Sequence, residues 1–420
     1  MVALPTPFEA YQLDLGRLGV DDDLCAADSM WLLVAHCLSR FANQPETARL
    51  DLAGRCAMAL QQFAASASDG DGDDSHPLDE TALGDLGRLI EALQKYGERS
   101  GQEMLARAVL DMSARMSAFG ALTLAYTLVG STREAVRGGP TRMTGLLLAE
   151  QARITRLLGQ LDEAEGMYAA VRGLAERSGD LELEARSSLG SGVVAQRRGN
   201  YPKARECFER GLLAATRLGH RNLEAIAHQG LTITALGAHD YDGALRHGWE
   251  TLNRVAGDSA REAEAFVNLA NASMAAGYPR AALHALLRSL HHSTEHRVVV
   301  TALGNAALAA AQCGEVGMVE MLGARLERTM AESELPYENA YASYDYSKAL
   351  DMIGQSVRAD SFRNRVRALA QERSFFELLH CLEADEPTRR TVPPVQRCEL
   401  EETTQSVVRE LETMECDLLV

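Results

Sequence analysis

The chain has 420 residues, 46% of them hydrophobic and 24% charged, which is enough for two or three ordinary domains or one elongated repeat array. Aromatic residues make up only 5%, and the many Ala, Leu, Glu and Arg residues favour helices over a β-sandwich. The net charge of -17 disfavours a direct nucleic-acid-binding surface.

The expected compartment is the cytoplasm. The first residues lack the basic and apolar regions of a signal peptide, and no run of 18 apolar residues would span a membrane. The 8 cysteines are scattered without a Cys-x-x-Cys pair, which predicts reduced thiols and neither a disulfide framework nor a structural zinc site. We expect no membrane contact and no cofactor.

Two segments precede the most regular part of the sequence. Residues 1–45 are predicted to form an N-terminal capping region around a helix at 28–42. Residues 46–102 are predicted to form a divergent helix pair, interrupted by the acidic insertion 69–77.

The insertion matches part of a calcium-binding loop. Four acidic residues stand at loop positions 1, 3, 5 and 12, namely Asp69, Asp71, Asp73 and Glu80. Asp74, however, replaces the glycine of the sharp turn, and Pro77 occupies position 9. We interpret the insertion as a solvated loop, with a calcium site as the alternative.

Residues 103–382 are predicted to form a helical repeat array. A turn residue recurs at intervals of 39, 40, 40, 38, 37 and 40 residues, at Gly120, Gly159, Gly199, His239, Gly277, Gly314 and Gly354. The residue five positions later is Ala in each case except Val319, and a bulky residue often follows one helical turn on. This spacing predicts pairs of helices of about 14–18 residues that stack because one pair cannot bury its apolar face alone.

Two segments carry a family resemblance. The sequences RRGNYPKARECF (197–208) and FVNLANASMAAGYPRAAL (266–283) resemble tetratricopeptide repeats at their Asn-Leu, Gly-x-Tyr and Ala positions. The period of about 40 residues is similar to the long-period bacterial type of the family. The resemblance implies an all-α, right-handed superhelical α-solenoid of stacked antiparallel helix pairs, and a protein-interaction function.

In such a stack the first helix of each pair lines the concave face, where a partner would bind. Counting back from each turn residue predicts these partner-binding positions: Glu150, Arg153, Arg156, Arg186, Gln196, Arg197, Gln229, Asn268, Asn271, Asn305, Tyr341 and Tyr344. The four arginines at 153, 156, 186 and 197 form a basic stripe suited to carboxylates, which favours an acidic partner. The asparagines suit the backbone amides of a bound chain.

The sequence offers no complete version of two more specific sites. Asn271 and Asn305 match the two asparagines of chaperone-binding members of the family, but Tyr341 and Asp345 stand where basic residues would be needed, so we predict no chaperone binding. His292 and His296 would share one face of a continuous helix, with His284 two turns earlier. We interpret these histidines as helix-end residues, with a metal site as the alternative.

The repeat pattern stops near residue 383. Residues 383–397 are predicted to form a linker, and residues 398–420 an acidic amphipathic tail. The apolar face of the tail comprises Leu400, Thr404, Val407, Val408, Leu411, Met414 and Leu418.

The predicted function is that of a non-enzymatic cytoplasmic scaffold, because the sequence shows no phosphate loop, dinucleotide fingerprint or nucleophile elbow. Its groove would bind a peptide or protein segment, acidic in character. The alternative is a partner-dependent regulator or sensor module of a transcription or signalling system, autoinhibited by a tail that folds back into the same groove. Self-association through apolar end faces is a further expectation.

Overall fold

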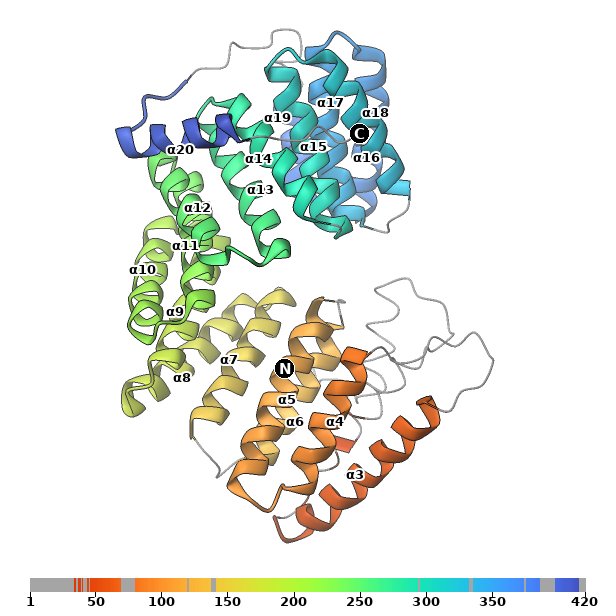
Figure 1. Ribbon diagram of the computed structural model, residues 1–420, viewed down its shortest axis with the longest axis vertical. Helices are drawn as coiled ribbons and strands as arrows, with labels where there is room; N and C mark the ends of the chain where they lie inside the picture. The colour runs from red at the N-terminus through yellow and green to blue at the C-terminus, as the bar shows by residue number, and fades with distance from the viewer. Residues whose placement is uncertain are drawn as a thin grey trace. The chain divides into compact units, whose positions relative to one another are not determined.

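The computed structural model describes Val34, Cys37, Leu38, Arg40, Gln44 and residues 46–68, 80–118, 121–136, 141–293, 295–331, 335–373, 375–385 and 397–414. Within these ranges the chain is helical and without strands, which confirms the predicted all-α class (Figure 1). The chain divides into two compact units, Met1–Val194 and Ala195–Val420. The insertion 69–77, with its alternative calcium site, and residues 386–396 of the predicted linker lie outside the described residues.

Unit 1 contains these described helices: α3 (Glu46–Ser68), α4 (Glu80–Gln94), α5 (Arg99–Ala118), α6 (Leu122–Ala135), α7 (Thr141–Leu157), α8 (Leu161–Ser178) and most of α9 (Leu181–Arg197). From α3 to α8 each helix packs against the next, and α7 also contacts α5. Val34 and Leu38, from the predicted capping helix, are buried in the same apolar core as Leu60 and Leu89.

Unit 2 contains α10 (Tyr201–Leu218), α11 (Arg221–Gly237), α12 (Tyr241–Val255), α13 (Ser259–Ala275), α14 (Pro279–His292), α15 (His296–Gln312), α16 (Val316–Ala331), α17 (Pro336–Met352), α18 (Ser356–Arg373), α19 (Phe376–Asp385) and α20 (Glu402–Thr413). Four consecutive pairs, α11–α12, α13–α14, α15–α16 and α17–α18, stack so that the first helices α11, α13, α15 and α17 contact one another in order. The predicted linker therefore starts later than expected, because α19 continues to Asp385.

The helix starts reproduce the predicted period. The first helices of successive pairs begin at Thr141, Leu181, Arg221, Ser259, His296 and Pro336, which are 40, 40, 38, 37 and 40 residues apart. The turn residues within the described pairs have left-handed backbone, with φ of 82° at Gly159 and 71° at Gly199. His239 adopts the same conformation, with φ of 58°, although a Cβ atom disfavours it. In the described pairs from α7–α8 onward, the turn residue has this left-handed conformation, as the spacing predicted.

Small and bulky residues have the packing roles that the repeat predicted. The residue five positions after each described turn, from Ala164 to Ala359, is completely buried in the crossing of its helix pair. In two pairs the bulky residue one turn later, Tyr168 or Phe208, packs against a glycine of the next first helix. A Cβ atom at Gly190 would overlap the ring of Tyr168, and one at Gly230 would overlap the ring of Phe208. These contacts join one pair to the next.

The last pairs use the same kind of contact in reverse. Gly323 lies on the second helix α16, and Tyr346 of the first helix α17 fills the space above it. Gly304 of α15 leaves no room for a Cβ atom against the backbone of Ala342 in α17. Close backbone contact between α15 and α17 therefore exceeds the contact between α16 and α17, which explains why the repeat pattern weakens in this part of the sequence.

The C-terminal helix α20 lies against α12 and α14, which are second helices of their pairs (Figure 1). Its buried face consists of Thr404, Val407, Val408 and Leu411, as the amphipathic pattern predicted. The prediction that the tail folds back into the groove of first helices is wrong for this described part of it. The apolar strip that α12 and α14 leave uncovered gives these side chains a burial site, and the first helices offer polar side chains instead.

The contact between Gly230 and Phe208 yields a stability prediction. Gly230→Ala should lower the free energy of unfolding by about 1–3 kcal/mol, because the added methyl group overlaps the buried ring. Gly166→Ala, at an open position of α8, should stabilise the protein slightly through helix propensity. In urea denaturation, Gly230→Ala combined with Phe208→Leu should destabilise less than the sum of the two single changes. Strict additivity would contradict this packing.

Candidate functional site

The first helices of unit 1 hold their charges in internal ion pairs. The carboxylate of Glu150 on α7 accepts hydrogen bonds from Arg153 Nε at 2.9 Å and from Ser113 Oγ at 2.6 Å. Burial alone would raise the pKa of Glu150, but the hydrogen bonds from Arg153 and Ser113 outweigh it and keep the pKa below its usual value. Arg153 also donates to Ser117 Oγ at 2.8 Å. Two of the predicted site residues therefore bind each other.

The other arginines of the predicted stripe in unit 1 also have local partners. Arg186 Nε donates to Glu182 at 2.9 Å, and Arg142 donates to the same carboxylate at 2.6 Å. Burial opposes the charge of Glu182, but these hydrogen bonds keep its pKa below the usual value. Arg156 hydrogen-bonds Tyr168, a residue of the interface between pairs. The Glu150–Arg153 and Glu182–Arg186 pairs have the i,i+3 and i,i+4 spacing of helical ion pairs, so the sequence carried a signal for them. The contact of Arg142 with Glu182 joins residues 40 positions apart and had no such signal.

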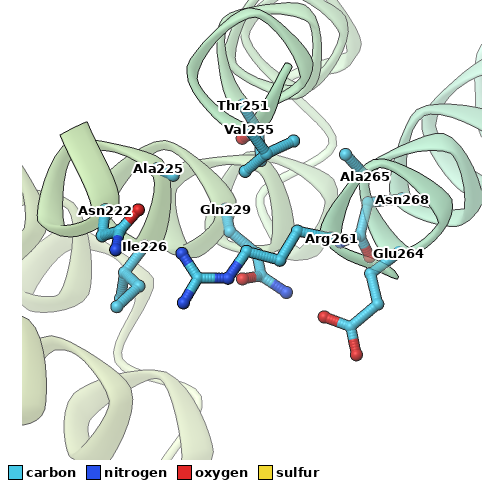
Figure 2. Close-up of a pocket in the computed structure, with 10 residues that line it drawn as sticks. All are labelled: Asn222, Ala225, Ile226, Gln229, Thr251, Val255, Arg261, Glu264, Ala265 and Asn268. Carbon is cyan, nitrogen blue, oxygen red and sulfur yellow. The ribbon is translucent and has the colours of Figure 1, made fainter. Parts of the chain in front are cut away.

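Two adjoining hollows lie on the face formed by α11, α13 and α15, which we call the first-helix face. One measures about 180 Å³ and lies between α11 and α13, with Thr251 and Val255 of α12 at its base. The other measures about 240 Å³ and extends across α13 to α15. Both are lined by Gln229, Glu264 and Asn268, so they form one continuous surface across three helices. Figure 2 shows Arg261 reaching from α13 toward Gln229 and Ile226.

The amide side chains of this face are available for a ligand. Among the described residues, neither Gln229 nor Asn268 has a hydrogen-bond partner for its side chain, although each is half-buried. Asn305 Nδ2 donates to Asn271 Oδ1 at 2.9 Å, which leaves both N–H donors of Asn271, and one N–H donor and the Oδ1 acceptor of Asn305, without a partner in this pair. Of the predicted positions, the structure thus brings four amides of three neighbouring helices onto one surface.

The remaining predicted positions serve packing or local contacts. Gln196 Nε2 donates to Thr234 Oγ1 at 3.2 Å, and Arg197 is exposed. Tyr341 packs on Tyr337, with ring centroids 4.8 Å apart. Tyr344 is buried, its hydroxyl donates to Asp385, and burial raises its pKa above the ordinary range. As partner-binding residues these positions stay predictions.

Sequence reasoning missed four residues of the first-helix face. Ile226 and Ile233 of α11 expose 43% and 42% of their surface on either side of Gln229. Arg261 and Glu264 of α13 line the hollow, and Arg261 Nε lies 3.4 Å from Asp258. A signal was present, since positions 226, 229 and 233 share one face at helical spacing. It was missed because isoleucines in a repeat are ordinarily assigned to the core.

The histidines that suggested a metal site are separated. α14 ends at His292 and α15 begins at His296, so the two are not on one continuous helix. His292 Nδ1 lies 3.2 Å from Glu262, while His284 Nδ1 lies 3.2 Å from the carbonyl oxygen of Met414. In the part of the chain that the structure describes, no three His, Cys, Asp or Glu side chains are grouped closely enough to bind a metal ion.

Comparison with known proteins supports the repeat assignment. The family model described as "Tetratricopeptide repeat" matches residues 183–255. The chain contains tetratricopeptide repeats. A solved structure from Pyrococcus horikoshii, a signal transduction ATPase with numerous domains (STAND) protein with a tetratricopeptide repeat sensor, is similar in fold, with a TM-score of 0.53 and 10% identity. The alignment covers 90% of this chain and 74% of that one.

The family resemblance predicted from the sequence is thus confirmed, and so is the α-solenoid class. Tetratricopeptide repeats are generally protein-interaction modules, and the family is generally non-catalytic. None of the helices that the structure describes combines the length and hydropathy that a membrane crossing requires.

A pair of histidines links α11 to α12 next to the first-helix face. His228, next to Gln229, and His247 have their Nδ1 atoms 3.1 Å apart. One Nδ1 must hold the proton and the other must accept it, so protonation of both rings breaks the hydrogen bond. Burial, followed by the nearby charge of His228, lowers the pKa of His247 to about 4, and burial also lowers the pKa of His228.

The surroundings of the pair contain charges of both signs. Arg254 donates to Glu224 at 2.7 Å and to Glu250 at 2.6 Å, and its charge lowers the pKa of His228 after burial does. Arg246 and Arg205 act on His247 in the same direction, and Asp240 opposes them. The balance leaves both rings neutral in the folded protein at neutral pH.

The depressed pKa values predict acid sensitivity. A histidine whose pKa is lower in the folded state contributes its full stability above about pH 6.5, and this contribution is lost as the pH falls toward 4. Protonation of His247 alone should lower the free energy of unfolding by about 3 kcal/mol over that window. Urea denaturation at pH 7 and pH 4.5 should show a smaller pH dependence for His247→Gln than for the wild type. Equal pH dependence in both proteins would contradict the assignment.

Proposed function

We propose that this protein is a non-enzymatic interaction protein that binds an extended polypeptide segment across α11, α13 and α15. The observation that carries the proposal is the pair of half-buried amides without partners, Gln229 and Asn268, shared by two adjoining hollows. A side-chain amide presents one acceptor and two donors, and therefore complements the N–H and C=O groups of a peptide backbone.

The dimensions of the face suit a short segment. Neighbouring helices pack about 8–10 Å apart, so three first helices extend over about 20 Å. An extended chain rises about 3.3 Å per residue, which corresponds to about six residues of ligand. The exposed Ile226 and Ile233 flank Gln229, so apolar side chains of the ligand would contact α11 beside its backbone hydrogen bonds.

The acidic character predicted for the ligand is supported at one position. Arg153 and Arg186 are neutralised by Glu150 and Glu182, so we move the site away from residues 150–197. Arg261 exposes 45% of its side chain and meets Asp258 at 3.4 Å through Nε. A ligand carboxylate beside Gln229 would bind the outer nitrogens of Arg261.

We also propose that the protein acts in the cytoplasm. The six described cysteines form no disulfide, and Cys37, Cys56 and Cys207 are buried, as expected in a reducing compartment.

A regulatory sensor role is the second candidate. It is supported by the fold similarity to a STAND protein whose tetratricopeptide repeats are described as a sensor. In that role, a ligand on the first-helix face would be the signal, and another surface of the chain would pass it on.

Peptide binding can be tested with a library of random heptapeptides selected against the wild-type protein. For the selected peptides, we expect Asn268→Ala and Gln229→Ala each to weaken binding about tenfold, because each removes hydrogen bonds to the backbone. Arg261→Gln should weaken binding selectively for peptides that contain Asp or Glu. Fluorescence anisotropy with labelled peptides measures these affinities.

Gln371→Ala, which removes an exposed amide from α18, is the matched control and should leave binding unchanged. Peptides that bind Asn268→Ala and Gln229→Ala as tightly as the wild type would refute the site. The thermal unfolding midpoint of each variant shows whether the fold is retained.

A further inference from the structure

The C-terminal segment is held on a surface that the proposed peptide site does not use. Residues 397–414, which we call the tail segment, lie on α12 and α14 and include the helix α20 (Figure 1). Leu400, Val407, Val408 and Leu411 are buried in the apolar core of unit 2, and Met414 packs at its edge. The tail segment thus binds as an amphipathic helix in an apolar groove, a common mode of peptide recognition.

Polar contacts fix the start of the tail helix. The Asp242 carboxylate of α12 accepts the backbone N–H of Glu401 at 2.8 Å and the hydroxyl of Thr404. Asp242 therefore caps the N-terminus of α20 in place of a capping side chain within α20 itself. Arg246 of α12 lies 4.0 Å from the carboxylate of Glu401, so the groove offers both an acceptor for the helix start and a cation for its acidic side chains.

The remaining contacts also involve the backbone of the tail segment. The N–H of Cys398 donates to the Ala276 carbonyl at 3.0 Å, and the Tyr278 hydroxyl donates to the Cys398 carbonyl at 2.9 Å. At the other end, His284 Nδ1 lies 3.2 Å from the carbonyl oxygen of Met414. The groove therefore contacts the backbone and a few apolar side chains of the bound helix. Most side-chain positions of a ligand would be free to vary.

The outer face of the tail segment is acidic and exposed. Glu399, Glu401, Glu402 and Glu410 are exposed, and Glu401 lies at the edge of the groove, 4.0 Å from Arg246. We propose that the α12–α14 face is a second docking site, for an acidic amphipathic helix, and that the tail segment occupies it as a displaceable ligand. A partner helix with the apolar spacing of Leu400, Thr404, Val407 and Leu411 would bind there in its place.

Tethering explains why the site is filled by the chain itself. Covalent attachment to the same chain keeps the tail segment at an effective concentration of about millimolar near its groove. A partner helix must therefore bind more tightly than the tail segment, or the tail segment must first be weakened. This site is separate from the first-helix face, so the proposal stands independently of the amide site.

The test uses the full chain and a fluorescently labelled peptide of residues 397–414. The intact wild type should show no binding at micromolar peptide, because its own tail segment fills the groove. Leu411→Asp places a charge in the apolar interface, releases the tail segment, and should make the labelled wild-type peptide bind at least tenfold more tightly. Adding Asp242→Ala to Leu411→Asp should reduce that binding again by removing the anchor of the helix start.

The matched control is Glu410→Ala, an exposed neighbour of Leu411, which should behave like the wild type. A second variant leaves the tail segment unaltered and carries a specific protease site within residues 386–396. After cleavage, the labelled peptide should exchange with the released tail segment, while circular dichroism shows that the rest stays folded.

Three results would overturn the proposal. The first is a peptide that binds neither Leu411→Asp nor the cleaved chain while both remain folded. The second is a peptide that binds intact wild type as tightly as Leu411→Asp. The third is a wild-type dimer in size-exclusion chromatography that Leu411→Asp converts to monomer, which would place the tail segment of one copy on a second copy.

Discussion

The structure depends on close approach between helices at positions where a side chain larger than alanine would not fit. The completely buried Ala204 and Ala244 let the two helices of a pair touch, and Gly230 admits the ring of Phe208 from the preceding pair. Such contacts bury apolar surface between neighbouring pairs. Each pair therefore needs its neighbour, and the fold extends by repetition of one interface.

Burial of the apolar side chains between helix pairs leaves mainly polar side chains on the outer faces of the first helices. The apolar side chains are used between helices. Gln229, Asn268 and the Asn271–Asn305 pair lie on one surface, and contacts within the protein use only some of their hydrogen-bonding groups. The same face carries two exposed isoleucines, Ile226 and Ile233. A surface with free amides and exposed apolar groups suits a ligand that supplies both backbone and side chains.

The sequence determined the parts of this picture that depend on local spacing. The period, the left-handed turns and the buried alanines all follow from residues close together in the chain, and the apolar face of α20 follows from helical periodicity. Contacts between distant residues were not predictable in this way. Nothing in the spacing showed that Arg153 would bind Ser117, 36 positions earlier, or that Asp242 would bind the start of a helix 159 positions later. The amide positions were found by counting, whereas Ile226 was missed because an isoleucine in a repeat is ordinarily assigned to the core.

The separation between Asp242 and Glu401 has a consequence for how the protein is made. Translation proceeds at about 5–20 residues per second, so α12 and α14 are complete several seconds before the residues that cover them emerge. During that interval the surfaces of α12 and α14 that α20 contacts lack their final cover. Nascent chains therefore pass through a stage in which this strip is open to chaperones or to neighbouring nascent chains, and synthesis of the last helix ends it.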